Sequence, residues 1–208
     1  MDAVTKRANK IKIRTIIENL EKRNMKGYSC QDAAEAKELA LSLIGEDDVV
    51  AWGGSVTVEQ IGIRSELKNV IDRDAAPPED FIKVRREALL SDVFLTSTNA
   101  ITMDGELVNI DGMGNRVAAM CFGPGKVIVI AGANKIVQDE EAAIARIKTD
   151  ACPPNCVRLL KKTPCAQTGK CGDCKIPGQT ICSYTVTTRF SSLPDRIHVI
   201  LVNENLGF

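Results

Sequence analysis

The sequence has no excess of charge, no long hydrophobic run and only one histidine. Lys plus Arg and Asp plus Glu both number 27, so the overall electric field that draws nucleic acid or anionic lipid is missing. No stretch approaches the roughly 20 apolar residues needed to span a bilayer. Charged residues also interrupt residues 1–27 every few positions, which is unlike a signal peptide. The sequence therefore predicts a cytoplasmic protein with neither a nucleic-acid nor a membrane partner.

The single histidine, His198, cannot be combined with other residues into a recognisable Ser–His–Asp or Cys–His arrangement. It falls inside the apolar run "IHVILV" near the C-terminus and is predicted to be a core residue rather than a catalyst. The catalytic residues stay unknown at this level, with Glu59 and Asp111 as the acid–base candidates.

The pattern of apolar residues predicts an α/β fold. Residues 5–24 and 31–44 have the spacing of amphipathic helices. Short β-branched strands at 48–52, 69–74, 92–97 and 126–132 then alternate with helical segments, among them 56–67 and 78–92. Residues 99–110 resemble a hairpin around Asp104-Gly105. This alternation indicates a mostly parallel sheet with helices on both faces. Residues 1–208 are expected to form one domain, with a cysteine-rich segment at 149–185 inserted before the last strand.

Six of the eight cysteines lie between positions 152 and 182. Cytoplasmic thiols stay reduced, so a dense group of them is more typical of a metal site than of disulfides. There is one C-x2-C pair, whereas a zinc ribbon usually has two. With one flanking cysteine on each side, this pair supplies four thiolates on fewer than twenty residues, which favours a [4Fe–4S] cluster. The predicted metal ligands are Cys165, Cys171, Cys174 and Cys182.

Two alternatives to the iron–sulfur cluster stay open. Structural zinc would use the same four thiolates, and unligated reduced thiols need no metal at all. Cys152 and Cys156 are either alternative ligands or a redox pair.

Three loops rich in glycine and polar residues are expected at the carboxyl ends of strands. In a parallel sheet these ends meet at one edge, where α/β proteins bind ligands. "WGGSVT" follows the first strand, "TSTNAI" follows the third, and "DGMGNR" follows the hairpin, where Arg116 is able to grip an anion. None of the loops is a Walker A or a dinucleotide-binding motif. The predicted binding residues for a small anion are Gly53, Gly54, Ser55, Thr57, Thr98, Asn99, Asp111, Gly114, Asn115 and Arg116.

Three stretches together resemble the LUD-domain family, which includes the lactate-utilisation protein C (LutC/YkgG) type. They are "GGSVTVEQIGI", the run from "LTSTNAITMDGELVNIDGMGNR" to "GANKIV", and the tail "TPCAQTGKCGDC…ICS". The resemblance covers roughly residues 10–205 and is to compact, cysteine-tailed members. It implies a fold like that of ribose-5-phosphate isomerase and the coenzyme A transferases (NagB/RpiA type). It also implies a part in the oxidation of lactate to pyruvate beside iron–sulfur partner subunits.

The residues and the resemblance lead to three functional hypotheses. The first is a redox-associated LUD protein that binds a small anionic metabolite and carries a [4Fe–4S] cluster. The second is an isomerase-like or transferase-like metabolic enzyme with a structural zinc site. The third is a non-catalytic assembly or regulatory subunit, and in each case the chain is able to form an oligomer.

Overall fold

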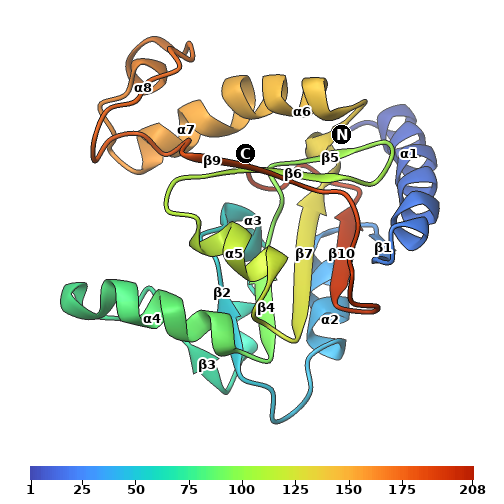
Figure 1. Cartoon of the computed structure of the whole chain (residues 1–208). Coiled ribbons are helices and arrows are strands. Elements are labelled where there is room, and N and C mark those ends of the chain that lie inside the picture. Colours follow the sequence, from blue (N-terminus) through green and yellow to red (C-terminus); the bar gives the residue numbers. More distant parts are fainter.

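A six-stranded parallel sheet forms the centre of the structure, a computed structural model that describes residues 1–208 (Figure 1). The strand order is β1-β10-β7-β4-β2-β3, and every neighbouring pair is parallel. The predicted α/β fold with a mostly parallel sheet is therefore confirmed. The strands are β1 (Lys26–Cys30), β2 (Val50–Trp52), β3 (Val70–Ile71), β4 (Val93–Thr96), β7 (Lys126–Gly132) and β10 (Ile197–Val202).

Helices cover both faces of this sheet because successive side chains of a strand point to opposite sides. On β7, Val127 and Val129 pack into one buried cluster, together with residues of α1 (Ala3–Lys22) and α5 (Asn115–Cys121). Ile128 and Ile130 pack into a second cluster, with α2 (Ala33–Ser42) and α3 (Val56–Gln60). The near-continuous apolar run of β7 is thus explained by burial on both faces.

A second, four-stranded sheet lies beside the carboxyl end of β7. Its order is β8 (Ile136–Val137), β5 (Ala100–Thr102), β6 (Leu107–Asp111) and β9 (Tyr184–Thr188). The predicted hairpin at 99–110 is confirmed as the antiparallel pair β5 and β6, with Asp104-Gly105 in its turn. Figure 1 shows α6 (Glu140–Arg146) and α7 (Cys152–Arg158) lying across this sheet, and a third buried cluster joins them to it.

Several elements differ from the sequence prediction. Helix 56–67 ends after α3, because Gly62 with φ +67° interrupts it and a short 3-10 turn follows. Within the predicted helix at 78–92, only α4 (Phe81–Glu87) is α-helical, and the strand at 69–74 shortens to β3. The cysteine-rich segment contains helices α7 and α8 (Pro164–Thr168), and β9 then returns the chain to the small sheet.

His198 lies in β10, buried as predicted. Its ring stacks on Tyr28, whose hydroxyl is 2.9 Å from Nδ1, and burial lowers the pKa of His198. These contacts give the histidine a structural role on the sheet. None of the helices is both long and apolar enough to cross a membrane.

Candidate functional site

A cavity of about 240 Å³ opens at the carboxyl ends of β2, β4 and β7, between the large sheet and the cysteine-rich segment. Its position is the one that parallel sheets use for ligands, because the loops that follow neighbouring strands converge there. Eight of the ten residues predicted to bind an anion line this cavity. They are Gly54, Ser55, Thr57, Thr98, Asn99, Asp111, Asn115 and Arg116.

The two remaining predicted residues, Gly53 and Gly114, do not line the cavity but shape the loops beside it. A Cβ added to Gly53 would lie 3.1 Å from Cγ of Arg116, so the end of β2 packs directly on that side chain. Gly114 caps α5 with φ +89°, a conformation that glycine adopts without strain. Both glycines thus shape the loops rather than line the cavity.

Lys135 is the most buried charged side chain of the cavity lining, with 4% of its surface exposed. Its Nζ donates hydrogen bonds to Oγ1 of Thr57 at 2.9 Å and to Oγ of Ser97 at 2.8 Å. Each hydroxyl donates its own proton to a backbone carbonyl, at Leu206 and Thr98 respectively. The hydroxyl lone pairs therefore face the ammonium group, and one of its three N–H groups is left for a ligand.

No carboxylate forms an ion pair with Lys135. Burial lowers the pKa of the Lys135 amine to about 7, and the positive charges of Arg146 and Arg116 add to this effect. A buried cation without an acidic partner is unusual, since buried charges in proteins are normally paired. Lys135 therefore has no negatively charged side chain beside it.

Arg116 contributes charge to the cavity, but its donors are already in use. Its two terminal nitrogens donate to Ser97 O, Asn109 Oδ1, Asn99 Oδ1 and Ile110 O, and Nε lies 3.5 Å from Oδ2 of Asp111. The four terminal N–H groups thus all have protein acceptors, and Nε faces the carboxylate of Asp111. In this arrangement Arg116 binds together the ends of β4, β6 and the start of α5.

Two further arginines lie at the rim of the cavity. Arg73 reaches Gly54 from the loop after β3, with Nη1 placed 3.1 Å from a Cβ built on that glycine. Arg158 projects from α7 and donates to Oδ1 of Asn155. With Lys135 and Arg116, the lining contains four basic side chains and a single acidic side chain, so its electrostatic potential favours an anion.

Sequence reasoning did not identify Lys135, Arg73 or Arg158. Lys135 had a usable signal, since "GANKIV" directly follows the strand at 126–132 and so belongs to the same edge as the three predicted loops. The two arginines had none, because Arg73 lies on the loop after a two-residue strand and Arg158 lies on a helix within the cysteine-rich segment.

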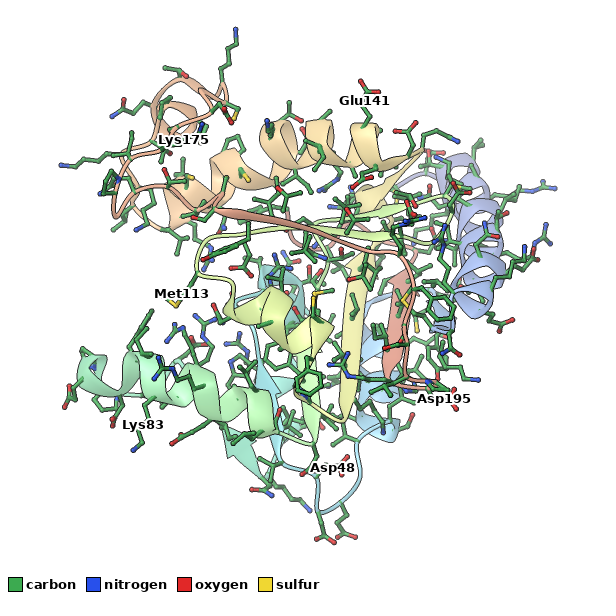
Figure 2. All side chains as sticks on the ribbon, viewed as in Figure 1. Asp48, Lys83, Met113, Glu141, Lys175 and Asp195 are labelled. Atoms are coloured by element: carbon green, nitrogen blue, oxygen red, sulfur yellow. The ribbon has the colours of Figure 1, made fainter.

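Both acid–base candidates contact other groups of the protein. Glu59 lies on α3 outside the cavity lining, and its carboxylate is 3.5 Å from the partly buried Arg64. Asp111 does line the cavity, but its carboxylate accepts hydrogen bonds from the backbone N–H groups of Met113, Gly114 and Val117 besides its contact with Arg116. Asp111 is therefore the anchor of the loop that precedes α5. Met113 on that loop is about half exposed and points outward in Figure 2.

The predicted metal ligands do not converge. Cys165 is buried with its sulfur 3.3 Å from Thr163 Oγ1, while Cys171 and Cys174 lie half-buried on the loop that carries Lys175 at its outer end (Figure 2). No three cysteine, histidine or acidic side chains are arranged so that they could share one metal ion. The thiols as placed here do not fit a four-thiolate centre, and the [4Fe–4S] cluster and the zinc alternative stay predictions.

Cys182 instead pairs with Cys152. Their sulfur atoms are 3.4 Å apart, although 30 positions separate the residues in the chain. Cys152 begins α7, is buried and lines the cavity, whereas Cys182 is exposed on the segment before β9. These two could not be paired among the six cysteines beforehand, because connectivity cannot be deduced from spacing alone.

Comparison with known proteins agrees with this architecture. The family model described as LUD domain matches residues 13–202. The crystal structure of a DUF162 family protein from Deinococcus radiodurans superimposes with a TM-score of 0.56 at 14% sequence identity, covering 93% of this chain and 98% of that one. At such low identity the likeness concerns the fold alone. No curated protein matches the chain in sequence.

Proposed function

Since the chain belongs to the LUD domain family, we propose that it is a lactate-utilisation-related protein that binds a small anionic metabolite through Lys135. The proposed ligand is a small carboxylate of the lactate or pyruvate kind. We place the protein with the lactate-utilisation protein C type, in which it works beside iron–sulfur oxidoreductase subunits.

The observation that carries this proposal is the unpaired charge of Lys135. The ammonium group is buried between two hydroxyls, lacks a carboxylate partner and lines the cavity. A ligand carboxylate beside Nζ would supply the missing negative charge and accept the third N–H. Charge-assisted hydrogen bonds of this kind are about twice as strong as neutral ones.

The size and polarity of the cavity favour a small ligand. Its volume of about 240 Å³ is below the roughly 300–1,000 Å³ of pockets for drug-sized molecules. The polar residues Ser55, Asn99 and Asn115 also line it. These groups suit the hydroxyl or carbonyl oxygen of a 2-hydroxy or 2-oxo acid better than an apolar chain.

Isothermal titration calorimetry at pH 6.5 tests the proposal, with lactate, pyruvate, acetate and inorganic phosphate as separate ligands. We expect the wild-type protein to bind lactate or pyruvate, and the Lys135→Met variant to bind neither within the measurable range. Lys83→Met is the matched control, because Lys83 is exposed on α4 and distant from the cavity lining (Figure 2). Equal affinity in wild type and Lys135→Met would reject Lys135 as the anion site. Tight binding of phosphate with no binding of carboxylates would keep the anion site but reject the ligand class.

A further inference from the structure

We propose that Cys182 and Cys152 form a redox-active dithiol at the rim of the cavity, which low-molecular-weight disulfides oxidise reversibly to a Cys152–Cys182 disulfide. The proposal is independent of the anion that the cavity binds. It concerns Cys182, which is one of the predicted metal ligands, and Cys152, which is one of the two alternative ligands.

The distance between the sulfur atoms carries the proposal. At 3.4 Å the two thiols are in contact, and a movement of little more than 1 Å would bring them to the roughly 2.05 Å of a disulfide bond. Each of the two cysteines is held in place by its own part of the fold. Cys152 is fixed in the first turn of α7, and the backbone N–H of Ser183 donates to Asp111 O at 3.0 Å, which ties the Cys182 segment to the end of β6.

The two thiols have different environments, and this difference assigns their roles. Cys182 is exposed and can meet a dissolved reagent, whereas only 8% of Cys152 is exposed. This difference in access makes Cys182 the attacking thiol and Cys152 the resolving thiol.

The other cysteines lack this combination. Cys30 is buried in the core, and burial raises its pKa to about 11. The sulfur of Cys165 contacts the hydroxyl of Thr163 and the thiol of Cys156, but Cys156 and Cys165 are both buried. The sulfur of Cys174 contacts the hydroxyl of Thr180, which cannot form a disulfide. Cys121 is exposed on α5, away from the cysteine-rich segment. An exposed thiol in contact with a buried one thus occurs at Cys182.

The reaction takes place in two exchange steps. The Cys182 thiolate attacks one sulfur of a disulfide RSSR, which forms a mixed disulfide Cys182–S–S–R and releases RS⁻. Cys152 loses its proton and attacks the Cys182 sulfur of that bond, which forms the Cys152–Cys182 disulfide and releases the second RS⁻. The protein thereby loses two protons and two electrons, and RSSR is reduced to two RSH.

Peptide mapping of the full chain tests the proposal. Protein reduced and desalted under anaerobic conditions, with its zinc, iron and sulfide contents measured, is treated with glutathione disulfide at pH 7.5 and quenched with acid. We expect the wild type to lose two of its eight thiols and to yield a peptide linking residues 152 and 182. Added dithiothreitol should restore both thiols.

Three variants assign the steps. Cys152→Ala should accumulate the mixed disulfide at Cys182, and Cys182→Ser should react with glutathione disulfide at least tenfold more slowly. Cys174→Ser, in the same segment, should keep the wild-type rate. A main product linking any other pair of cysteines would overturn the proposal, and so would zinc or an iron–sulfur cluster that protects Cys182 until it is removed. Mapping of the wild type decides the matter even if a variant fails to fold.

Discussion

The strongest test of the cation in the cavity is the pH dependence of stability in the Lys135→Met variant. Methionine keeps an unbranched side chain of similar length but removes the ionisable group. In the wild type, burial together with Arg146 and Arg116 lowers the pKa of Lys135 from 10.5 to about 7. Because the folded pKa is lower than the unfolded one, the folded state binds fewer protons between these two pH values.

This difference in proton binding fixes the sign of the effect. Below pH 7 Lys135 is protonated in both states, and the folded protein bears the full unfavourable free energy of the buried charge. As pH rises from 7 towards 10.5, the folded amine loses its proton while the unfolded one keeps it, so the wild type gains stability. With the two pKa values above, the free energy of unfolding of the wild type should rise by roughly 2.5 kcal/mol between pH 6 and pH 9 through Lys135 alone.

The variant lacks this contribution at every pH. It also loses the hydrogen bonds to Thr57 and Ser97, which are worth about 1 kcal/mol each, but this loss is the same at both pH values. We therefore expect the stability of Lys135→Met relative to the wild type to fall by roughly 2.5 kcal/mol from pH 6 to pH 9. At pH 6 the variant should be the more stable of the two.

Urea unfolding of both proteins at pH 6 and pH 9, with reductant and without ligand, measures this difference. The Lys83→Met control should keep the same stability relative to wild type at both pH values. A Lys135→Met difference that stays constant from pH 6 to pH 9 would refute the reasoning, because it would mean that Lys135 has an ordinary pKa and carries its charge without an unfavourable free energy.

Three further predictions concern the same part of the molecule. Carboxylate affinity should fall by up to tenfold per pH unit above pH 7, since the Lys135 ammonium group is the form that binds, and calorimetry in two buffers should show proton uptake. Arg116→Met should destabilise the protein by roughly 3–5 kcal/mol in urea unfolding, because it removes the buried ion pair with Asp111 and the four hydrogen bonds of the guanidinium group. The rate of alkylation of Cys182 by iodoacetamide, followed by mass spectrometry, should reach half its maximum near pH 7 in the wild type, because the hydrogen bond with Cys152 lowers the pKa of Cys182 to about 7. Cys152→Ala removes this hydrogen bond and should raise the midpoint towards about 8.5.

Local patterns in the sequence were sufficient to predict the sheet and the edge at which the cavity opens. The alternation of strands and helices specifies the parallel sheet, because each strand run is apolar on both faces, as Val127 to Ile130 are on β7. The loops that follow strands then meet at one edge for purely topological reasons. This is why eight of the ten predicted residues line one cavity without any knowledge of side-chain positions.

Contacts between distant segments could not be predicted in this way. Arg116 looks like an anion-binding side chain in the sequence, and only the structure shows that five acceptors surround its guanidinium group. Strand β9 is polar and half exposed, so it has little apolar pattern of its own, and its pairing with β6 depends on the path of the preceding segment. Because of that path, Cys182 contacts Cys152 rather than Cys171 or Cys174, which are nearer to it in the sequence.

The dithiol is part of the cavity wall, because Cys152 and Ile181 line the same cavity as Lys135. Closing the Cys152–Cys182 bond would fix the segment at 181–183 against the first turn of α7 and so alter the rim of the cavity. Thermodynamic linkage makes any such coupling reciprocal: if the disulfide changes carboxylate affinity by a given factor, the carboxylate changes the dithiol–disulfide equilibrium by the same factor. Titration of the wild type with glutathione redox buffers, with and without a saturating carboxylate, and calorimetry on the reduced and oxidised forms should therefore give equal factors. Unequal factors would show that the two measurements report on different sites, and a factor of one in both would show that the dithiol and the cavity act independently.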